Sequence, residues 1–372
     1  MEPVIEAIEG HVLRAPIDVP VANAFGAMTN RPALFLRVIA SDGAWGWGEV
    51  FCNFPQVGAE HRARLVRSIF VPLLRNATCD PEVITPMLEQ RTRRLALQCG
   101  EPGPFAQIAA AIDQALWDMA ARRAGVALWR HLGGENERVA VYASGIGPDD
   151  VVATVSKKRS EGFAAFKLKV GFGRERDVAN LRAMREALDD ATPIMTDANQ
   201  AWTPDEAVQR IAELAPLRPH WIEEPIPADE RPEMWRRLSA QSDIPLAAGE
   251  NIRGHQSFDD AIEGGWLGFV QPDIGKWGGI TRCRDVATHA RERNVVCCPH
   301  WLGGGVGLAA SLHFIAAYGT VASYAEVDAN PNPLREEVCQ MRLEDGCALL
   351  DDTPGIGVEP DLRRLQRFIV GY

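Results

Sequence analysis

The sequence predicts an α/β protein in which a parallel β/α barrel follows a smaller α+β domain. Short apolar runs recur at a nearly even spacing and begin near residues 139, 164, 194, 221, 245, 269, 295 and 322. Most intervals carry a helical pattern, and Thr203, Pro204 and Glu206 begin one of them with an N-cap, a first-turn proline and a capping-box acid. Such repeated βαβ units favour a closed barrel over a doubly wound sheet, although about 200 residues is short for a barrel.

Residues 1–130 are expected to form the α+β domain. Apolar residues over Val4–Ile8 are interspersed with acids, Glu6 within the run and Glu9 after it. The apolar run Leu34–Ala40 leads through the turn Ser41–Gly43 into a further strand at 44–49, as in a hairpin. Apolar side chains at helical spacing predict three helices, roughly over residues 60–75, 81–98 and 105–124.

Three further segments show no repeat of these patterns. The Gly-, Pro- and Asn-rich segments 15–32 and 51–58 are expected to be loops, either plain surface loops or lids over a substrate. The tail, 331–372, contains no ninth βα unit and is expected to return to the N-terminal domain. The predicted division is therefore 1–130, 131–330 and 331–372.

Composition argues against several classes of function. The 372 residues include 50 acidic and 39 basic side chains, a net charge of −11, which argues against nucleic acid or an anionic membrane as partner. No apolar run reaches the roughly 18 residues of a membrane span, and the first residues lack the features of a signal peptide. The eight cysteines show no Cys-x-x-Cys spacing. We therefore expect reduced thiols and a cytoplasmic protein.

Ionisable side chains follow the apolar stems of seven consecutive predicted strands. In chain order they are Lys167 and Lys169, Asp197, Glu223 with Glu224, Glu250, Asp273, His300 and Glu326. Side chains alternate in direction along a strand, and the catalytic groups of a barrel lie at the carboxyl ends of its strands. Seven such endings in register are hard to explain as solvated loop edges, so we expect them to meet at one barrel mouth.

Asp197, Glu223 and Glu250 are expected to bind one divalent cation. They end three neighbouring strands, where converging carboxylates repel one another unless a cation neutralises them. Oxygen ligands with room for water and substrate favour Mg²⁺, and no Cys/His tetrad competes for zinc. Two alternatives stay open, namely ordinary salt bridges to Lys or Arg and Glu224 as the ligand in place of Glu223.

Two candidate bases flank the expected metal. Lys167 and Lys169 share a strand face, and each ammonium raises the cost of protonating the other, so at least one of their pKa values is expected to be lowered. Asp273 ends the strand beside that of His300, where a carboxylate orients the imidazole and raises its basicity. Glu326 is expected to assist at a substrate oxygen or to form a salt bridge. This set suits α-proton removal from a carboxylate, with charge stabilisation of the enediolate.

These motifs resemble those of the enolase superfamily, in its mandelate racemase branch. The matching motifs are Lys167-x-Lys169, Asp197-x-Asn199, Glu223-Glu224-Pro225, Gly249-Glu250-Asn251, Gln271-Pro272-Asp273, Pro299-His300 and Glu326. The resemblance covers nearly the whole chain. It implies a modified (β/α)7β TIM barrel with an α+β capping domain that the C-terminal tail completes. The superfamily is itself the usual example of a Lys or His base beside Mg²⁺.

The resemblance also implies individual roles. Lys169 would be the base on one face of the substrate, with Lys167 tuning it and contacting the substrate carboxylate. His300, paired with Asp273, would be the acid/base on the opposite face. Asn199 would contact the substrate or the shell of the metal. A homo-oligomer, and a small carboxylate substrate read through the two cap loops, are implied as well.

Three reactions fit this pair of bases. Dehydration of an aldonate or aldarate comes first, with lysine taking the α-proton and histidine protonating the departing β-hydroxyl. Cycloisomerisation of a sugar-acid lactone comes second, because Phe166–Gly173, Pro299–Gly307 and Glu326–Pro333 are similar to stretches of lactone cycloisomerases in this branch. Racemisation at the α-carbon comes third.

Readings from other classes stay open. A Schiff-base aldolase would use Lys169 to form an imine, but it leaves the three metal-spaced carboxylates unexplained. A non-catalytic sugar-acid binding protein would have little use for paired bases. The glycines of 303–307 are a weak signal for a nucleotide site because the Walker lysine is missing. Close approach of backbone amides to an anionic substrate group explains them more simply.

Overall fold

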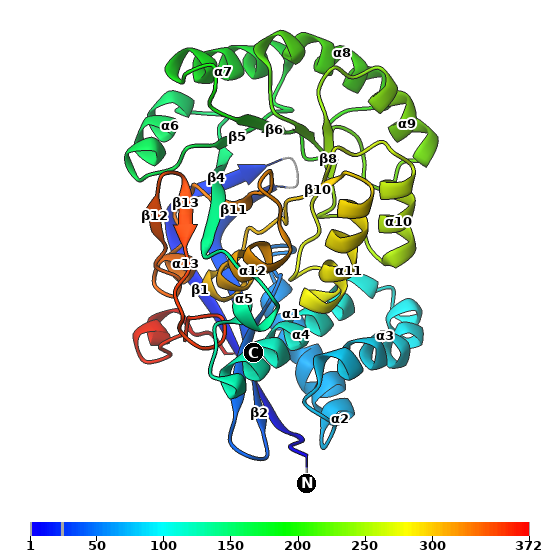
Figure 1. Cartoon of the computed structure of the whole chain (residues 1–372), viewed down its shortest axis with the longest axis vertical. Coiled ribbons are helices and arrows are strands. Elements are labelled where there is room, and N and C mark those ends of the chain that lie inside the picture. Colours follow the sequence, from blue (N-terminus) through cyan, green and yellow to red (C-terminus); the bar gives the residue numbers. More distant parts are fainter. Residues whose placement is uncertain (1, 24–25, 372) are drawn as a thin grey trace.

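A computed structural model describes residues 2–23 and 26–371 of the chain. An antiparallel sheet with its helices lies beside parallel strands that are surrounded by further helices (Figure 1). The antiparallel sheet has the order β1–β2–β3, made of β1 (Ile5–Asn23), β2 (Gly26–Ala40) and β3 (Trp45–Val50). We call this sheet and the helices that follow it the cap.

Six helical segments form the rest of the cap. They are α1 (Gly58–Leu65), the π-helical η1 (Val66–Phe70), α2 (Val71–Leu74), α3 (Pro81–Gln98), α4 (Pro102–Ala124) and α5 (Leu128–His131). α4 approaches β3 so closely that a Cβ atom at Gly46 or Gly48 would lie about 2 Å from a backbone oxygen of α4. The three expected helical stretches are confirmed.

The expectation that 15–32 forms a loop is wrong. Apart from residues 24–25, which lie outside the described chain, this segment continues β1 and β2 as a long antiparallel hairpin in which Val21 lies opposite Met28. The prolines of this segment favour a loop when the sequence is considered alone. In the structure the register of β1 against β2 shifts between Pro16 and Val21, and proline is accepted at such bulges and in edge strands. Residues 51–57 have the irregular structure expected of them.

Eight parallel strands follow at the predicted positions. They are β4 (Arg138–Ile146), β5 (Phe166–Lys169), β6 (Ile194–Asp197), β7 (Ile222–Glu223), β8 (Leu246–Ala248), β9 (Phe269–Val270), β10 (Val296–Cys297) and β11 (Ala325–Asp328). Each of β4 to β9 pairs in parallel with the next strand, and β11 pairs with β4. The parallel order is therefore β11–β4–β5–β6–β7–β8–β9–β10.

Seven helices connect these strands and lie around them in Figure 1. They are α6 (Val151–Ser160), α7 (Arg174–Ala187), α8 (Pro204–Leu214, continued by η2, Ala215–Leu217), α9 (Pro232–Ala240), α10 (His255–Glu263), α11 (Gly279–Glu292) and α12 (Gly305–Tyr318). The predicted capping box at the start of α8 is present, because Thr203 and Glu206 bond each other's backbone N–H groups. Seven helices between eight strands match the expected (β/α)7β order.

Side chains bridge the two end strands of this order. In the described residues no backbone ladder joins β10 to β11. Instead the Tyr324 amide donates to the Cys298 thiol at 3.4 Å, and the Trp301 amide donates to Glu326 Oε2 at 3.1 Å. The second of these contacts brings the end of β10 and the end of β11 together at the carboxyl side of the strands.

The tail contacts both halves of the molecule. It contains α13 (Pro333–Glu336), β12 (Arg342–Glu344), β13 (Cys347–Leu349) and η3 (Arg364–Phe368). β13 pairs antiparallel with β4 of the barrel, whereas the Val370 amide donates to Val12 O of the cap strand β1. The return to the cap is thus seen, while the boundaries at 130/131 and 330/331 stay predictions.

Within the described ranges, no helix combines the length and the apolar character that crossing a membrane requires.

Candidate active site

A cavity of about 460 Å³ lies between the carboxyl ends of the barrel strands and the cap. The barrel lines it with Lys169, Asn199, Glu250, Asn251, Lys276, His300 and Leu302. The cap lines it with Met28, Phe51, Asn53, Phe54, Pro55 and Gln107. Four of the nine predicted site residues therefore face the cavity, and the other five lie behind them.

Lys167 lies at the centre of the residues behind the cavity. Its Nζ donates to both oxygens of Glu223, at 2.7 and 2.9 Å, and lies 2.7 Å from Glu326 Oε1. The Tyr142 hydroxyl is 3.3 Å away. Burial alone would lower the pKa of Lys167, but the carboxylates of Glu223 and Glu326 outweigh it and raise the pKa well above its usual value. Because this lysine is fully buried, the implied contact with a substrate carboxylate stays a prediction.

Lys169 faces the cavity with a carboxylate beside it. Its Nζ donates to Asp197 Oδ2 at 2.5 Å and to Asn199 Oδ1 at 2.9 Å. Burial opposes its charge, yet Asp197 and Glu223 together outweigh burial and raise the pKa of Lys169. The expectation that neighbouring ammonium groups would lower one lysine pKa is therefore wrong for this structure. The carboxylates nearby contribute more than the repulsion between the two lysines.

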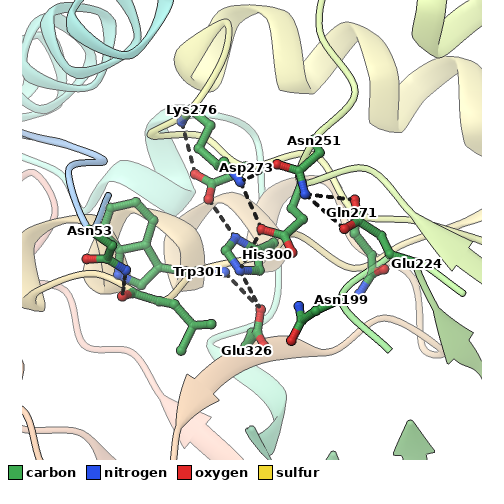
Figure 2. A network of polar contacts seen from close by, with 12 residues as sticks. Asn53, Asn199, Glu224, Asn251, Gln271, Asp273, Lys276, His300, Trp301 and Glu326 are labelled. Carbon is green, nitrogen blue, oxygen red and sulfur yellow. Dashed lines mark hydrogen bonds and ion pairs between the residues drawn. The ribbon is translucent and has the colours of Figure 1, made fainter. Parts of the chain in front are cut away.

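His300 completes the reactive groups on the other side of the cavity. Figure 2 shows its imidazole between Asp273 and Glu326. Nδ1 is 2.6 Å from Asp273 Oδ2, and Nε2 is 3.8 Å from Glu326 Oε2. Glu250 Oε2 lies 3.4 Å from Nε2. Burial alone would lower the pKa of His300, but Glu250, Glu326 and Asp273 outweigh it and raise the pKa to about 9. The imidazole is consequently held as a proton donor.

Lys276 is a cavity residue that strand patterns did not reveal. Its Nζ donates to Glu250 Oε2 at 2.8 Å and to Asn251 Oδ1 at 3.0 Å, as Figure 2 shows in part. Asp273 places it, because Asp273 Oδ1 accepts the amide of Lys276 at 3.1 Å. Lys276 lies three residues beyond the strand end, where the alternation of strand side chains no longer applies. Its one sequence signal is a basic residue in the loop that follows Asp273.

Glu224 supports the site from behind. Both of its oxygens accept from Asn251 Nδ2, at 2.8 and 3.0 Å, and Oε2 also accepts from Gln200 Nε2 at 3.0 Å. Glu224, Asn199 and Gln200 all have positive φ angles, of 38°, 44° and 64°. Backbone in this region is unfavourable for side-chain-bearing residues and is concentrated at functional sites. The backbone at the ends of β6 and β7 therefore takes a conformation that is typical of functional sites, and Asn199 lines the cavity.

The three carboxylates predicted to bind a metal are each engaged by other groups. Over residues 2–23 and 26–371, no three His, Cys, Asp or Glu side chains form a ready-made metal cluster. Asp197 is held by Lys169, Glu223 by Lys167 and Glu250 by Lys276. Burial, and then the charge of Asp197, raises the pKa of Glu223 to about 7.

The donor set nevertheless suits a hard cation. Its oxygens come from the ends of the neighbouring strands β6, β7 and β8. Gln271 Nε2 donates to Glu223 Oε2 at 2.6 Å. The buried Oε1 of Gln271 has no hydrogen-bond partner. An unpartnered buried oxygen and carboxylates that repel each other both favour an added cation with oxygen ligands.

Two family models match the chain. The model described as "Mandelate racemase / muconate lactonizing enzyme, N-terminal domain" matches residues 7–133. The model described as "Enolase C-terminal domain-like" matches residues 150–364. Together they cover most of the cap and nearly all of the barrel.

Curated relatives match over most of their length. D-galactarolactone cycloisomerase of Agrobacterium fabrum is 32% identical over 381 residues, covering 98% of this chain and 98% of the relative. D-galactonate dehydratase of Klebsiella pneumoniae is 31% identical over 347 residues, covering 88% of each chain. The two relatives are described by different reactions on sugar acids or their lactones.

Solved structures agree over the whole chain. A mandelate racemase/muconate lactonizing enzyme from Bordetella bronchiseptica RB50 is 45% identical, with a TM-score of 0.93 and 99% coverage of both chains. A racemase from Streptomyces coelicolor A3(2), described with bound magnesium, is 31% identical, with a TM-score of 0.88 and 99% and 100% coverage. The predicted fold class, a barrel with an N-terminal cap, is confirmed.

Proposed function

From the premise that the chain belongs to the mandelate racemase/muconate lactonizing enzyme family of the enolase superfamily, we propose that it removes the α-proton of an acid sugar and expels the β-oxygen. One observation carries this proposal. Lys169, from β5, and His300, from the end of β10, line the same cavity. β5 and β10 are five positions apart in the sheet order. Lys169 and His300 would therefore contact a bound substrate from two different sides.

Asp197, Glu223 and Glu250 are the residues that would hold Mg²⁺. The chemistry of their oxygens and the magnesium in a related racemase support this assignment. Bound there, Mg²⁺ would neutralise the substrate carboxylate and the enediolate, and its charge would lower the pKa of Lys169.

Each of the chain's own residues then has a distinct task. Lys169 Nζ takes the α-proton once it is neutral, and Asn199 orients this lysine through their 2.9 Å hydrogen bond. His300 gives its proton to the β-oxygen as the Cβ–O bond breaks, with Asp273 fixing the ring through Nδ1. Glu326, which accepts from the Trp301 amide and Ser144, stands behind His300 and Lys167. The tasks of Lys169, His300 and Asp273 match those that the resemblance implies. Asn199 and Glu326 differ, because the resemblance implies contact of Asn199 with the substrate or the metal shell and support of the enolate oxygen by Glu326.

Dehydration and lactone cycloisomerisation differ in the oxygen that leaves. In dehydration it is a β-hydroxyl, which departs as water, and the enol product becomes a 2-keto-3-deoxy acid. In cycloisomerisation it is a ring oxygen, which stays attached to the product. We place dehydration first, because a protonated His300 suits a leaving hydroxyl. Cycloisomerisation is the second candidate, and the near-complete match to a galactarolactone cycloisomerase favours it.

Racemisation is a weaker reading of the same site. It would need His300 to act as a neutral base in one direction, which the carboxylates of Asp273 and Glu326 beside its ring oppose. A Schiff-base aldolase is weaker still, because imine formation at Lys169 leaves the carboxylates at the ends of β6, β7 and β8 without a role. Homo-oligomerisation and a cytoplasmic location stay predictions. Light scattering of the purified protein would test the first of them.

Proton NMR of acid sugars and their lactones in D₂O tests the proposal. With Mg²⁺ present, we expect α-deuteration or turnover of at least one compound. A keto-deoxy acid, a rearranged lactone or an epimer would identify the reaction. Exchange that continues unchanged in EDTA would contradict the metal assignment. Silence across the whole panel would remove acid sugars as the substrate class.

A further inference from the structure

The two halves of the cavity differ in charge. All ionisable side chains that line it come from the barrel, and both ammonium groups there already face a carboxylate. Lys169 is paired with Asp197 at 2.5 Å, and Lys276 with Glu250 at 2.8 Å. The cap contributes four apolar side chains and two amides, Met28, Phe51, Phe54, Pro55, Asn53 and Gln107.

The described part of the cap thus offers no lining cation to a second anionic group. The cap region that a substrate's distal end would meet is neutral.

Gln107 is the polar contact that α4 supplies. Its Oε1 accepts from Arg62 Nε at 2.6 Å, so the two N–H groups of its amide remain as donors for the cavity. Both residues are buried, with 8% of Gln107 and 4% of Arg62 exposed. Arg62 also donates to the backbone oxygens of Gly58 and Phe54, at 2.9 and 3.2 Å. The guanidinium therefore does not line the cavity, and its charge acts by polarising the amide of Gln107.

Asn53 supplies the complementary contact. Its Nδ2 donates to Leu302 O at 2.8 Å (Figure 2), which leaves Oδ1 as an acceptor. One amide donor and one carbonyl acceptor match hydroxyl, ether or lactone oxygens. A carboxylate could accept from the Gln107 amide but could not donate to Asn53 Oδ1, and it would be desolvated beside four apolar side chains without a counter-ion.

We infer that the cap selects an acid sugar with a single carboxylate and an uncharged distal end, with Gln107 and Asn53 as the specificity-determining residues. The inference rests on the proposed function, which places the reacting carboxylate at the barrel end of the cavity. An aldonate, an anhydro sugar acid or a monolactone of an aldarate satisfies it. An open-chain aldarate does not.

Matched substrate pairs test the inference on the wild-type protein. Each hexonate is compared with the hexarate of the same configuration, which differs only in carrying a second carboxylate at C6, as D-galactonate differs from galactarate. With Mg²⁺ we expect kcat/KM for the monocarboxylate to exceed that for the dicarboxylate by about 100-fold, the order of an uncompensated buried charge. Equal or better turnover of the hexarates would overturn the inference and leave the proposed function standing. Exchange with no member of any pair would overturn both.

A substitution at Gln107 tests the assigned contact. Gln107→Glu keeps the shape of the side chain but pairs with Arg62 and removes both donors. We expect KM for the best monocarboxylate to rise about 10-fold, the order of one hydrogen bond left unmade, with kcat nearly unchanged because Gln107 lies away from the reacting groups. The same change at the exposed Gln98 is the control and should alter neither constant. A fall in kcat at constant KM, or no change at all, would show that Gln107 does not contact the substrate.

Discussion

Two groups of buried carboxyls in this molecule are stabilised in opposite ways. At the barrel mouth, Glu223 and Glu326 share the ammonium of Lys167. At the junction of cap and barrel, Glu49 accepts backbone N–H bonds from Gly304 and Gly307, at 2.5 and 2.9 Å, at the start of α12. Cations surround the first group. In the described part of the chain, the hydrogen bonds to the Glu49 carboxyl come from backbone N–H groups.

This difference distinguishes the candidate active site from the junction between the cap and the barrel. Burial raises the pKa of Glu49 to about 8, and that of Asp113, which bonds Thr85 and Thr281 across the same junction, to about 6. These carboxyls are held close to neutral. At the mouth, by contrast, Lys167 and His300 lower the pKa of Glu326 in spite of its burial. Lys167 and His300 thus favour the charged form of Glu326 at the mouth, whereas burial favours the neutral forms of Glu49 and Asp113 at the junction.

The largest expected effect comes from removing a reacting group at the mouth. Lys169→Met should lower the rate of α-exchange, and His300→Asn the rate of product formation, each by about 10² to 10⁴-fold, the usual range for a general acid or base. Ligand affinity should change little, because the other cavity contacts stay. Deuterium exchange by NMR and calorimetric titration with a slow substrate would measure the two quantities. Full turnover in either variant would remove that residue from the proposed roles.

Much of this arrangement follows from the sequence, and the reasons for the misses are physical. Repeats of apolar runs place eight strands, and period-two alternation brings Lys169, Asn199, Glu250 and His300 to one cavity. The hairpin over 15–32 was missed because its prolines lie at a shift in register that depends on the partner strand.

Lys276 and Gln107 were missed for a different reason. Lys276 lies in a loop whose path is set by the carboxylate of Asp273. Gln107 lies on a cap helix far from the barrel motifs in the sequence. Neither position belongs to a local periodic pattern. The pairing of every candidate metal ligand with a lysine is likewise a property of three-dimensional neighbours.

The second prediction concerns the cluster of Lys167, Glu223 and Glu326 at the mouth. Lys167→Met leaves Glu223 and Glu326 buried without their shared ammonium, so the free energy of unfolding in EDTA should fall by about 3–5 kcal/mol. Saturating Mg²⁺ should recover part of that loss, because a cation at Glu223 replaces some of the missing charge. Urea unfolding with and without Mg²⁺ measures both effects.

The control for this change is Arg237→Met on α9, which removes one cation from a pair with Asp205 whose side chains are 47% and 79% exposed. Its effect should stay below about 1 kcal/mol. If Lys167→Met is no more destabilising than the control, the ammonium is not what stabilises the mouth.

The smallest expected effect is the pH dependence of stability that Glu49 contributes at the junction of cap and barrel. The folded protein binds the Glu49 proton more tightly than the unfolded chain, because burial raises the pKa of Glu49 from its ordinary 4.5 to about 8. The stability that this proton contributes is therefore lost as the pH rises through that window. Glu49→Gln cannot titrate. It also replaces one acceptor oxygen with an amide, so wild type should be the more stable protein at pH 5. The advantage should shrink by about 1–3 kcal/mol by pH 8.5, as urea unfolding at several pH values would show.

Two features make this last test specific to Glu49. Asp113 titrates in both proteins, so its contribution cancels in the difference between wild type and Glu49→Gln. Glu6→Gln, at an exposed position of β1, is the matched control and should keep a constant gap from wild type. A gap that widens with pH for Glu49→Gln would mean that the carboxylate is the favoured form at the start of α12. The helix N-terminus would then outweigh burial, and the junction would be held by charge, as the mouth is.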